Sequence, residues 1–361
     1  LAYYLAIFAM VFGSTFGTFN AANAADVGNG ITDDDNTVTA YVFNTASKTL
    51  TITSENKVGG DVLTVRTGAI TDTAAGAIIK VITQTTDDST LTVTLVSVVL
   101  DASAGTMLFT DVDTAPGIVT LNVTGVLTTD GGVTVTTLED SDDENMVFDV
   151  AGALTVDGAF ALNAGGTGVT GNIELNLSNA AVNFNGGLTM ADISTTGLSN
   201  VSFDGAAATT VAGTIDGDAD NEGTIHIDTS SNAAVTFTGA IGQTNDVFLI
   251  NIDETAIFNE AVSAKGINVI AAHDATFKKD VTAGATKFVN AGTISLAGTA
   301  AQTVTGAIED GTIDIENTDG TVTFATALGV STIVTEIESD ASTTSIFNAV
   351  IDTTLVDLKG K

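Results

Sequence analysis

The chain of 361 residues contains no cysteine. This absence excludes disulfides, zinc–thiolate centres, iron–sulfur clusters and thiol nucleophiles. The fold must therefore be stabilised by packing and backbone hydrogen bonds, and a chain of this length can bury enough apolar surface to be stable without covalent links.

Basic residues are scarce as well. Lys and Arg together number 10 against 44 Asp and Glu, the formal net charge is −34, and no basic residue lies between Lys80 and Lys265. Binding to nucleic acid depends on such residues, so we exclude nucleic acid as a partner. An anionic lipid surface would repel the chain, whereas divalent cations and cationic partners would be attracted to it.

Tryptophan is absent, and Pro116 is the single proline. With so few cations, the acid–base pairs that support exposed helices cannot be built. Apolar residues instead alternate with Thr, as in Thr90-Leu-Thr-Val-Thr-Leu-Val96, which is the period of a half-buried strand. The sequence therefore predicts an all-β protein.

Residues 1–24 have the features of an export signal whose start is missing. An apolar run at 1–12 precedes Ala22-Asn-Ala24, the small-residue pattern of a cleavage site, so we expect cleavage after Ala24. The run is shorter than the roughly 20 residues that a membrane-spanning helix needs. We expect the sequence to begin inside a longer open reading frame and the mature protein to be extracellular, at a bacterial cell surface.

Beyond this signal the sequence predicts two regions. Residues 25–120 predict an N-terminal β cap or a small β domain. Residues 121–361 repeat a unit of the form Val-x-Phe-x-Gly-Ala-hydrophobic, and we expect this region to continue beyond residue 361 if the chain is truncated there.

The phenylalanines of the repeat unit recur at similar intervals, with one longer gap between the second and the third. They are Phe184, Phe203, Phe237, Phe258 and Phe277. We interpret them as one buried stack. We interpret the longer gap as a turn that carries an insertion, the acidic loop around Asp216.

A period of about 20 residues fits one turn of a right-handed parallel β-helix, a β-solenoid in which three short strands bring the chain back over itself. The alternative is a set of tandem antiparallel β-sandwich modules, which also consist of short Thr-rich strands and turns. We favour the solenoid, because a unit that recurs in one register at this period is too short for a sandwich domain.

The repeat unit, as in Val235-Thr-Phe-Thr-Gly-Ala-Ile241, lies in acidic sequence rich in Gly, Ala, Thr and Asn. In this respect residues 120–350 resemble the β-helical passenger regions of bacterial autotransporter adhesins and filamentous-haemagglutinin-like proteins, and also repetitive surface-layer proteins. The resemblance implies secretion across the outer membrane, a rod, and a role in adhesion or coat formation. Autotransporters also carry a C-terminal membrane β-barrel, and the sequence leaves open whether one follows residue 361.

The best candidate for a metal site is Asp216-Gly-Asp-Ala-Asp-Asn-Glu222. Its carboxylates at alternate positions, Asp216, Asp218, Asp220 and Glu222, are the oxygen ligands that calcium prefers. The segment lacks the Gly and the distal Glu of the helix–loop–helix calcium motif, which leaves a solvated acidic turn as the alternative interpretation. The sequence predicts no cofactor with certainty, and calcium is the one candidate.

Catalytic residues are not predicted. The two histidines, His226 and His273, lie outside any nucleophile motif, and we interpret both as turn or surface residues. Paired carboxylates could serve polysaccharide cleavage on a β-helix, but so acidic a chain always offers such a pair. We keep a polysaccharide-active enzyme as a minor alternative and expect no enzymatic activity.

Taken together, these features predict a secreted or cell-surface structural or adhesion protein that forms an acidic β-solenoid. The alternative is a calcium-dependent subunit of a surface layer. The expected partners are a cell-surface or extracellular ligand, or copies of the chain itself. We expect contact with a membrane only through a barrel or anchor that lies outside this sequence.

Overall fold

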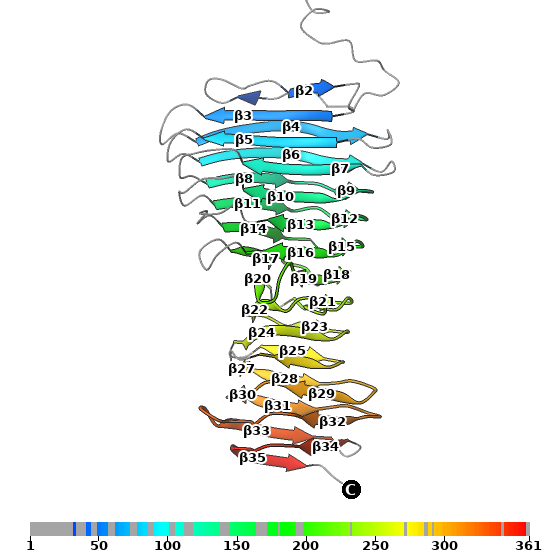
Figure 1. The fold of residues 1–361 in the computed structure, drawn as a ribbon, viewed down its shortest axis with the longest axis vertical. Helices are drawn as coiled ribbons and strands as arrows, with labels where there is room; N and C mark the ends of the chain where they lie inside the picture. Colours follow the sequence, from blue (N-terminus) through cyan, green and yellow to red (C-terminus); the bar gives the residue numbers. More distant parts are fainter. Residues whose placement is uncertain are drawn as a thin grey trace, which may run out of the picture.

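The computed structural model is a stack of short strands that runs from Thr32 to Leu358 (Figure 1). The predicted signal peptide, residues 1–24, lies outside the described residues. The structure describes residues 32–33, 41–44, 49–56, 62–72, 78–85, 90–100, 105–111, 118–137, 145–163, 172–179, 181–192, 198–231, 233–270, 273–284, 288–290, 292–340 and 343–358. Within these ranges every element is a strand, which confirms the all-β prediction.

Across the same ranges we find no helix with the length and apolar character needed to span a membrane.

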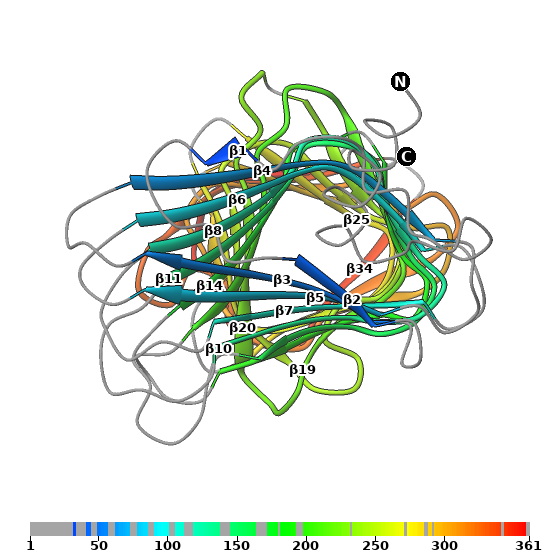
Figure 2. The same cartoon turned by 90° about the horizontal axis from the view of Figure 1, so that it is seen from above.

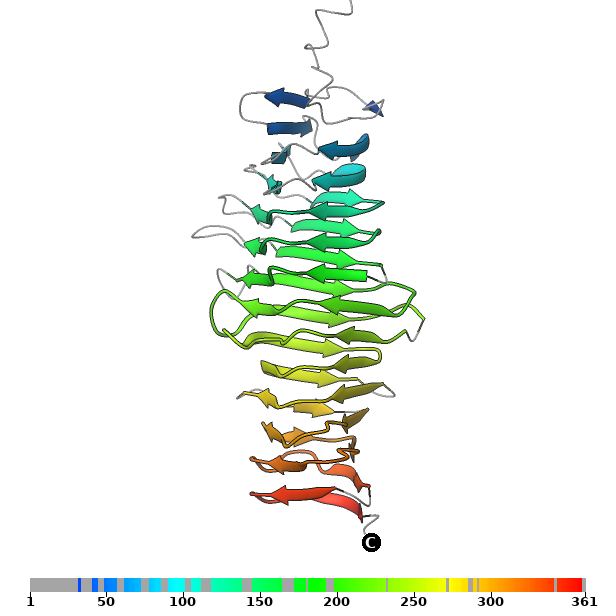
Figure 3. The same ribbon diagram turned by 90° about the vertical axis from the view of Figure 1, so that its right-hand side faces the viewer.

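Strands that lie one turn apart in the chain pair side by side and in parallel. Viewed along the axis, the turns superpose into a ring (Figure 2), and viewed from the side they form a stack (Figure 3), which identifies the fold as a β-solenoid. Antiparallel pairing occurs among the described strands only at the N-terminal end, where β1 (Thr32–Asp33) pairs with β4 and β2 with β3. The solenoid prediction is confirmed, and the antiparallel sandwich alternative is wrong.

Each full turn contributes strands to three faces. The first face contains β4 (Val62–Asp72), β6 (Thr90–Leu100), β8 (Ile118–Val123), β11 (Asn145–Val150), β14 (Asn172–Leu177), β17 (Ser199–Phe203), β20 (Glu222–Ile227), β22 (Val247–Ile252), β24 (Val262–Val269), β27 (Phe288–Asn290) and β30 (Ile308–Glu309). The second contains the end of β6, then β9 (Leu127–Thr129), β12 (Leu154–Val156), β15 (Ala181–Phe184), β18 (Thr209–Ala212), β21 (Val235–Phe237), β23 (Ala256–Phe258), β25 (Asp274–Phe277), β28 (Thr293–Leu296), β31 (Thr312–Ile315), β33 (Val334–Ser339) and β35 (Thr353–Leu358). The third contains β2 (Tyr41–Asn44), β3 (Thr49–Asn56), β5 (Ile78–Thr85), β7 (Thr106–Asp111), β10 (Val133–Thr137), β13 (Phe160–Asn163), β16 (Leu188–Ala191), β19 (Ile215–Gly217), the start of β24, β26 (Val281–Ala283), β29 (Gln302–Thr305), β32 (Thr321–Phe324) and β34 (Thr344–Phe347).

The ladders run across residue 120 without interruption. β4 pairs with β6 and β6 with β8 on the first face, and β5, β7 and β10 pair in the same way on the third. Hydrogen bonding therefore marks no boundary between the predicted regions 25–120 and 121–361. The division into a cap and a repeat region stays a prediction.

Turn length is not uniform, and the predicted period of about 20 residues holds only for some of the later turns, such as the one that joins Phe258 to its register partner Phe277. Asp149 pairs with Asn176, 27 residues further on, and turns of about 26 residues are typical of the structure. Turns shorten where a corner loop is lost: β24 passes from the third face to the first as one continuous strand, so that Asn251 and Asn268 are only 17 residues apart.

The predicted single stack of phenylalanines is partly wrong. Phe237, Phe258 and Phe277 do lie in one column of the second face, with ring centroids 5.1 and 4.8 Å apart and nearly parallel planes. Phe203, however, belongs to the first face and pairs with Ile227. The long interval between Phe203 and Phe237 is therefore a change of face and not an insertion.

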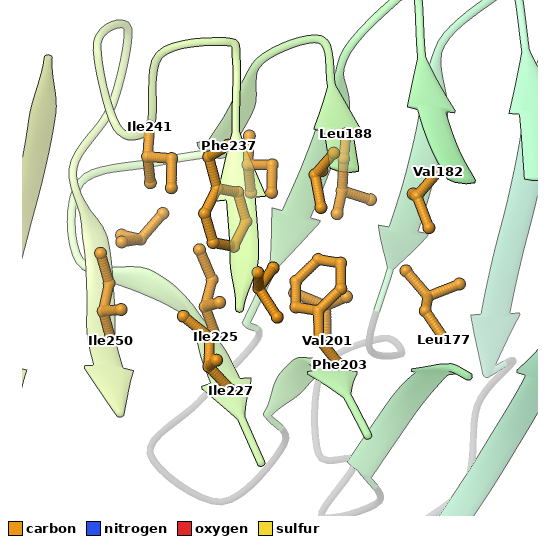
Figure 4. Close-up of a cluster of buried hydrophobic side chains, with 14 of the residues drawn as sticks. Leu177, Val182, Leu188, Val201, Phe203, Ile225, Ile227, Phe237, Ile241 and Ile250 are labelled. Atoms are coloured by element: carbon orange, nitrogen blue, oxygen red, sulfur yellow. The ribbon is translucent and has the colours of Figure 1, made fainter. Parts of the chain in front are cut away.

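The buried core fills the space between the three faces, with buried apolar side chains from Ile79 to Ile337. Inward residues alternate with outward ones, as in β11, so each turn contributes apolar side chains to the same interior (Figure 4). Phe203 of the first face and Phe237 of the second meet there edge to face at 5.3 Å. Because one turn cannot enclose its own apolar side chains, stacking of neighbours stabilises the fold.

Candidate functional site

A column of polar side chains runs along the outside of the first face. Its members occupy equivalent positions on seven consecutive turns, and all of them are half-buried. We call this set the polar column: Asn122, Asp149, Asn176, Ser202, His226, Asn251 and Asn268. Parallel strands stack at about 4.8 Å, so the column offers one polar group per turn at that spacing.

Hydrogen bonds join members of the column on both sides of its centre. Asn176 Nδ2 donates to Asp149 Oδ1 at 2.8 Å. Asn268 Nδ2 donates to Asn251 Oδ1 at 2.9 Å, and Asn251 Nδ2 lies 3.4 Å from His226 Nδ1. Neutral His226 accepts this last bond when its proton is on Nε2. These contacts hold the side chains in place before any partner arrives.

The column is interrupted at Ser202. Ser202 is its shortest side chain and lies between Asn176 and His226 in the register. Within the described part of the chain, its hydroxyl and the side-chain amide of Asn200, two residues earlier on β17, have no hydrogen-bond partner. No described residue therefore occupies the donors and acceptors of Ser202 and Asn200 at the centre of the column.

Carboxyl groups surround this centre. Burial raises the pKa of Asp149, outweighing the lowering effect of the hydrogen bond from Asn176, and Asp204 raises it further. Burial also raises the pKa of Glu174, while His226 lowers it and Asp149 and Asp204 raise it. With no Lys or Arg between Lys80 and Lys265, the region repels anions.

A second group of charges lies at the corner where the first face turns into the second. Asp204, Asp228 and Asp253 follow directly after β17, β20 and β22, and the backbone ladder continues through the latter two: Asp228 N–H donates to Phe203 O and Asp253 N–H to Ile227 O. Oδ1 of Asp253 is buried and has no hydrogen-bond partner among the described residues.

Both histidines of the chain lie near this corner. His273 Nδ1 is 3.2 Å from Glu254 Oε2, with both side chains mostly buried. Burial raises the pKa of Asp253 and the carboxylate of Asp228 raises it further, whereas His226 and His273 lower it. The sequence placed these histidines on turns or the surface but did not indicate that they flank one carboxyl group.

The predicted calcium loop runs from β19 through a turn to the first residue of β20, and three of its four carboxylates accept hydrogen bonds from backbone amides. Asp216 Oδ1 accepts from Thr244 N at 3.0 Å, and Asp220 Oδ1 accepts from Asp246 N at 3.4 Å. Glu222 Oε2 accepts from Ala219 N at 3.0 Å. The described side chain of Asp218 is exposed. Two of the four predicted ligands thus tie this loop to the equivalent loop of the next turn.

Among the residues that the structure describes, no group of three or more His, Asp or Glu side chains is arranged to hold a metal ion. Calcium binding at Asp216, Asp218, Asp220 and Glu222 stays a prediction.

The polar column was missed from the sequence because its linked members are separated by 17 to 27 residues and share no motif. A signal does exist: each is the polar residue between two apolar ones, as in Leu175-Asn-Leu177 and Ile250-Asn-Ile252. Aligning these short patterns turn by turn would have assembled the column.

Comparison of the chain with protein-family models, with curated proteins and with solved structures finds no match in any of the three.

Proposed function

We propose that this protein is an extracellular structural or adhesion element, a rod that presents a repeated acidic surface outside the cell. The observation that carries the proposal is the run of parallel ladders through three faces, which repeats equivalent outward positions turn after turn. Such an architecture offers an extended surface for binding, as solenoid proteins generally do. The export-signal features of residues 1–24 supply the compartment.

The charge of the rod fits an extracellular role. A net charge of −34 keeps a β-rich polymer dispersed, and salt screens the repulsion over roughly 8 Å at physiological ionic strength. Antibody labelling of intact and of permeabilised source cells tests the compartment. Labelling only after permeabilisation would refute an extracellular location.

A second candidate function is a subunit of a cation-dependent coat. It is favoured by the stacking of like charges on the last turns of the second face, where Asp314, Glu338 and Asp357 are register partners. Burial raises the pKa of Glu316 beside them, and Asp314 and Asp340 raise it further. Divalent cations would relieve this repulsion and allow rods to associate.

Negative-stain microscopy with and without millimolar calcium separates the two candidates. Single rods in both conditions support the adhesion element, and calcium-dependent sheets support the coat. Compact particles without an elongated shape in either condition would contradict both.

A further inference from the structure

We propose that the polar column of the first face binds an uncharged, extended polysaccharide that lies along the axis of the rod, with one sugar seated over Ser202. This inference names the ligand of the adhesion element and so rests on the proposed function. It is carried by the geometry of Asn176, Ser202 and His226, which present an amide, a hydroxyl and an imidazole on consecutive turns.

The chemistry of the column suits sugar hydroxyls. Each hydroxyl of a sugar both donates and accepts a hydrogen bond, and amide, imidazole and hydroxyl side chains can answer both roles. The Nδ2 group of Asn176 and that of Asn268 each donate one hydrogen to the preceding member of the column, and each has a second hydrogen with which to donate. The side chains of Ser202 and Asn200 have no partner of their own among the described residues.

The spacing of the column suits a polymer. Turns repeat at about 4.8 Å, slightly less than the length of one pyranose unit in an extended chain. Successive sugars can therefore meet successive turns. The column is half-buried and hydrogen-bonded on both sides of its centre, so binding immobilises few additional side chains.

The acidic residues around the column disfavour charged polymers as its ligand. Asp149, Glu174 and Asp204 act on one another electrostatically around the centre of the column, so a polymer of uronic or sulfated sugars would be repelled. A polycation would be attracted to the acidic surface as a whole and would not select the column.

The binding is expected to be weak for a single sugar and to grow with length. Trp is absent from the chain, so no indole can stack on the sugar rings and hydrogen bonds carry most of the affinity. Each net hydrogen bond contributes modestly, and repeated contacts along one polymer add up. We therefore expect affinity to rise several-fold with each added sugar until the column is filled.

The test uses the full chain, insoluble cellulose and chitin in pull-down, and soluble oligosaccharides of both polymers in increasing length by calorimetry, all in roughly 0.15 M salt to screen nonspecific charge effects. Ser202→Leu fills the break in the column and is expected to weaken binding about tenfold or more, the cost of losing one or two hydrogen bonds to a bulky side chain. The matched control is Thr236→Leu, a half-buried outward position on β21 of the second face, which should bind like the unmodified chain.

Asn200→Ala gives a second test that does not depend on tolerance of a larger side chain. Its side-chain amide has no described partner in the protein, so the variant should keep the circular dichroism of the parent and bind roughly fivefold more weakly. Loss confined to Ser202→Leu and Asn200→Ala supports the proposal.

Four results would overturn it: equal binding by all variants, equal loss in Thr236→Leu, binding by the parent chain only to charged polymers such as alginate or chitosan, or absence of binding to every neutral probe. In each case, observation of rods on intact cells would still support the proposed structural function. Failure of the polysaccharide proposal can therefore be distinguished from failure of the proposed function.

Discussion

Phe258 offers the sharpest test of the solenoid core. Its ring lies between Phe237 and Phe277 in nearly parallel stacks at 5.1 and 4.8 Å, and only 1% of the residue is exposed. Truncating a buried phenylalanine to alanine typically costs about 3–5 kcal/mol. Each aromatic pair adds about 0.5–1.5 kcal/mol beyond area burial, and Phe258→Ala loses two pairs. We expect a loss of stability near the upper end, about 5 kcal/mol.

The matched control is Phe248→Ala on the neighbouring strand β22. Phe248 is half-buried on the outside, and its described ring contact is with Lys265, whose Nζ lies 4.8 Å from the ring centroid. A cation–π contact at an exposed site contributes about 0.5–1 kcal/mol, so we expect a loss of about 1 kcal/mol.

Urea unfolding followed by circular dichroism measures the difference. Because each turn contacts only its neighbours, the lesion should act locally, and hydrogen exchange should accelerate first in β23 and β25. Equal destabilisation by Phe258→Ala and Phe248→Ala would refute the inward stack and with it the assignment of the second face.

Three further predictions concern pH, backbone and cations. Stability should rise as the pH is lowered from 7 toward the unfolded pKa values of the carboxyl groups whose pKa is raised, 3.8 for Asp and 4.5 for Glu. A carboxyl whose pKa is raised on folding contributes stability that is fully present below its unfolded pKa and is lost as the pH rises through its folded pKa. Urea midpoints at constant ionic strength measure this change, and a midpoint that falls as the pH is lowered from 7 to 5 would refute it. The carboxyl groups concerned are Asp149, Glu174, Asp192, Asp253 and Glu316. Gly213→Ala should destabilise the protein by about 2 kcal/mol or more, because Gly213 has a φ of 94° and an added Cβ would lie 1.7 Å from Phe184 O. The control is Gly284→Ala, whose added Cβ would have its nearest neighbour at 3.5 Å and which should change stability by no more than about 0.5 kcal/mol. Thermal melts measure both variants, and similar melting temperatures would contradict the stacked turns. If the acidic loop binds calcium, millimolar calcium should raise the melting temperature and Asp218→Asn with Asp220→Asn should abolish that rise; a calcium response that survives in the double variant would place the site elsewhere.

The fold class was predictable because it depends on local periodicity. A half-buried strand alternates apolar and polar residues whatever it pairs with, so Leu127-Thr-Thr129 and Leu154-Thr-Val156 could be matched from sequence, and the two strands do pair in that register. The spacing of Phe258 and Phe277, one short turn apart, was also readable directly.

The face on which each unit lies was not predictable. The same Val-x-Phe pattern occurs in β17 of the first face, in β21 of the second and in β32 of the third, with Phe203, Phe237 and Phe324 all buried. Any inward strand of this solenoid satisfies the pattern, so sequence spacing cannot distinguish one face from another. Corner loops of different length then shift the register between turns.

The polar column shows the same division. By itself the sequence determined that Asn176, Ser202 and His226 would point outward, since each lies between apolar residues of a strand. Only the tertiary structure decided that they would stack on consecutive turns, because this stacking depends on the number of residues in the corner loops of each turn. Alternation of apolar and polar residues depends only on neighbouring residues. Alignment of side chains along the axis depends on the length of whole turns, so a change in the length of a corner loop can shift that alignment without altering the strands.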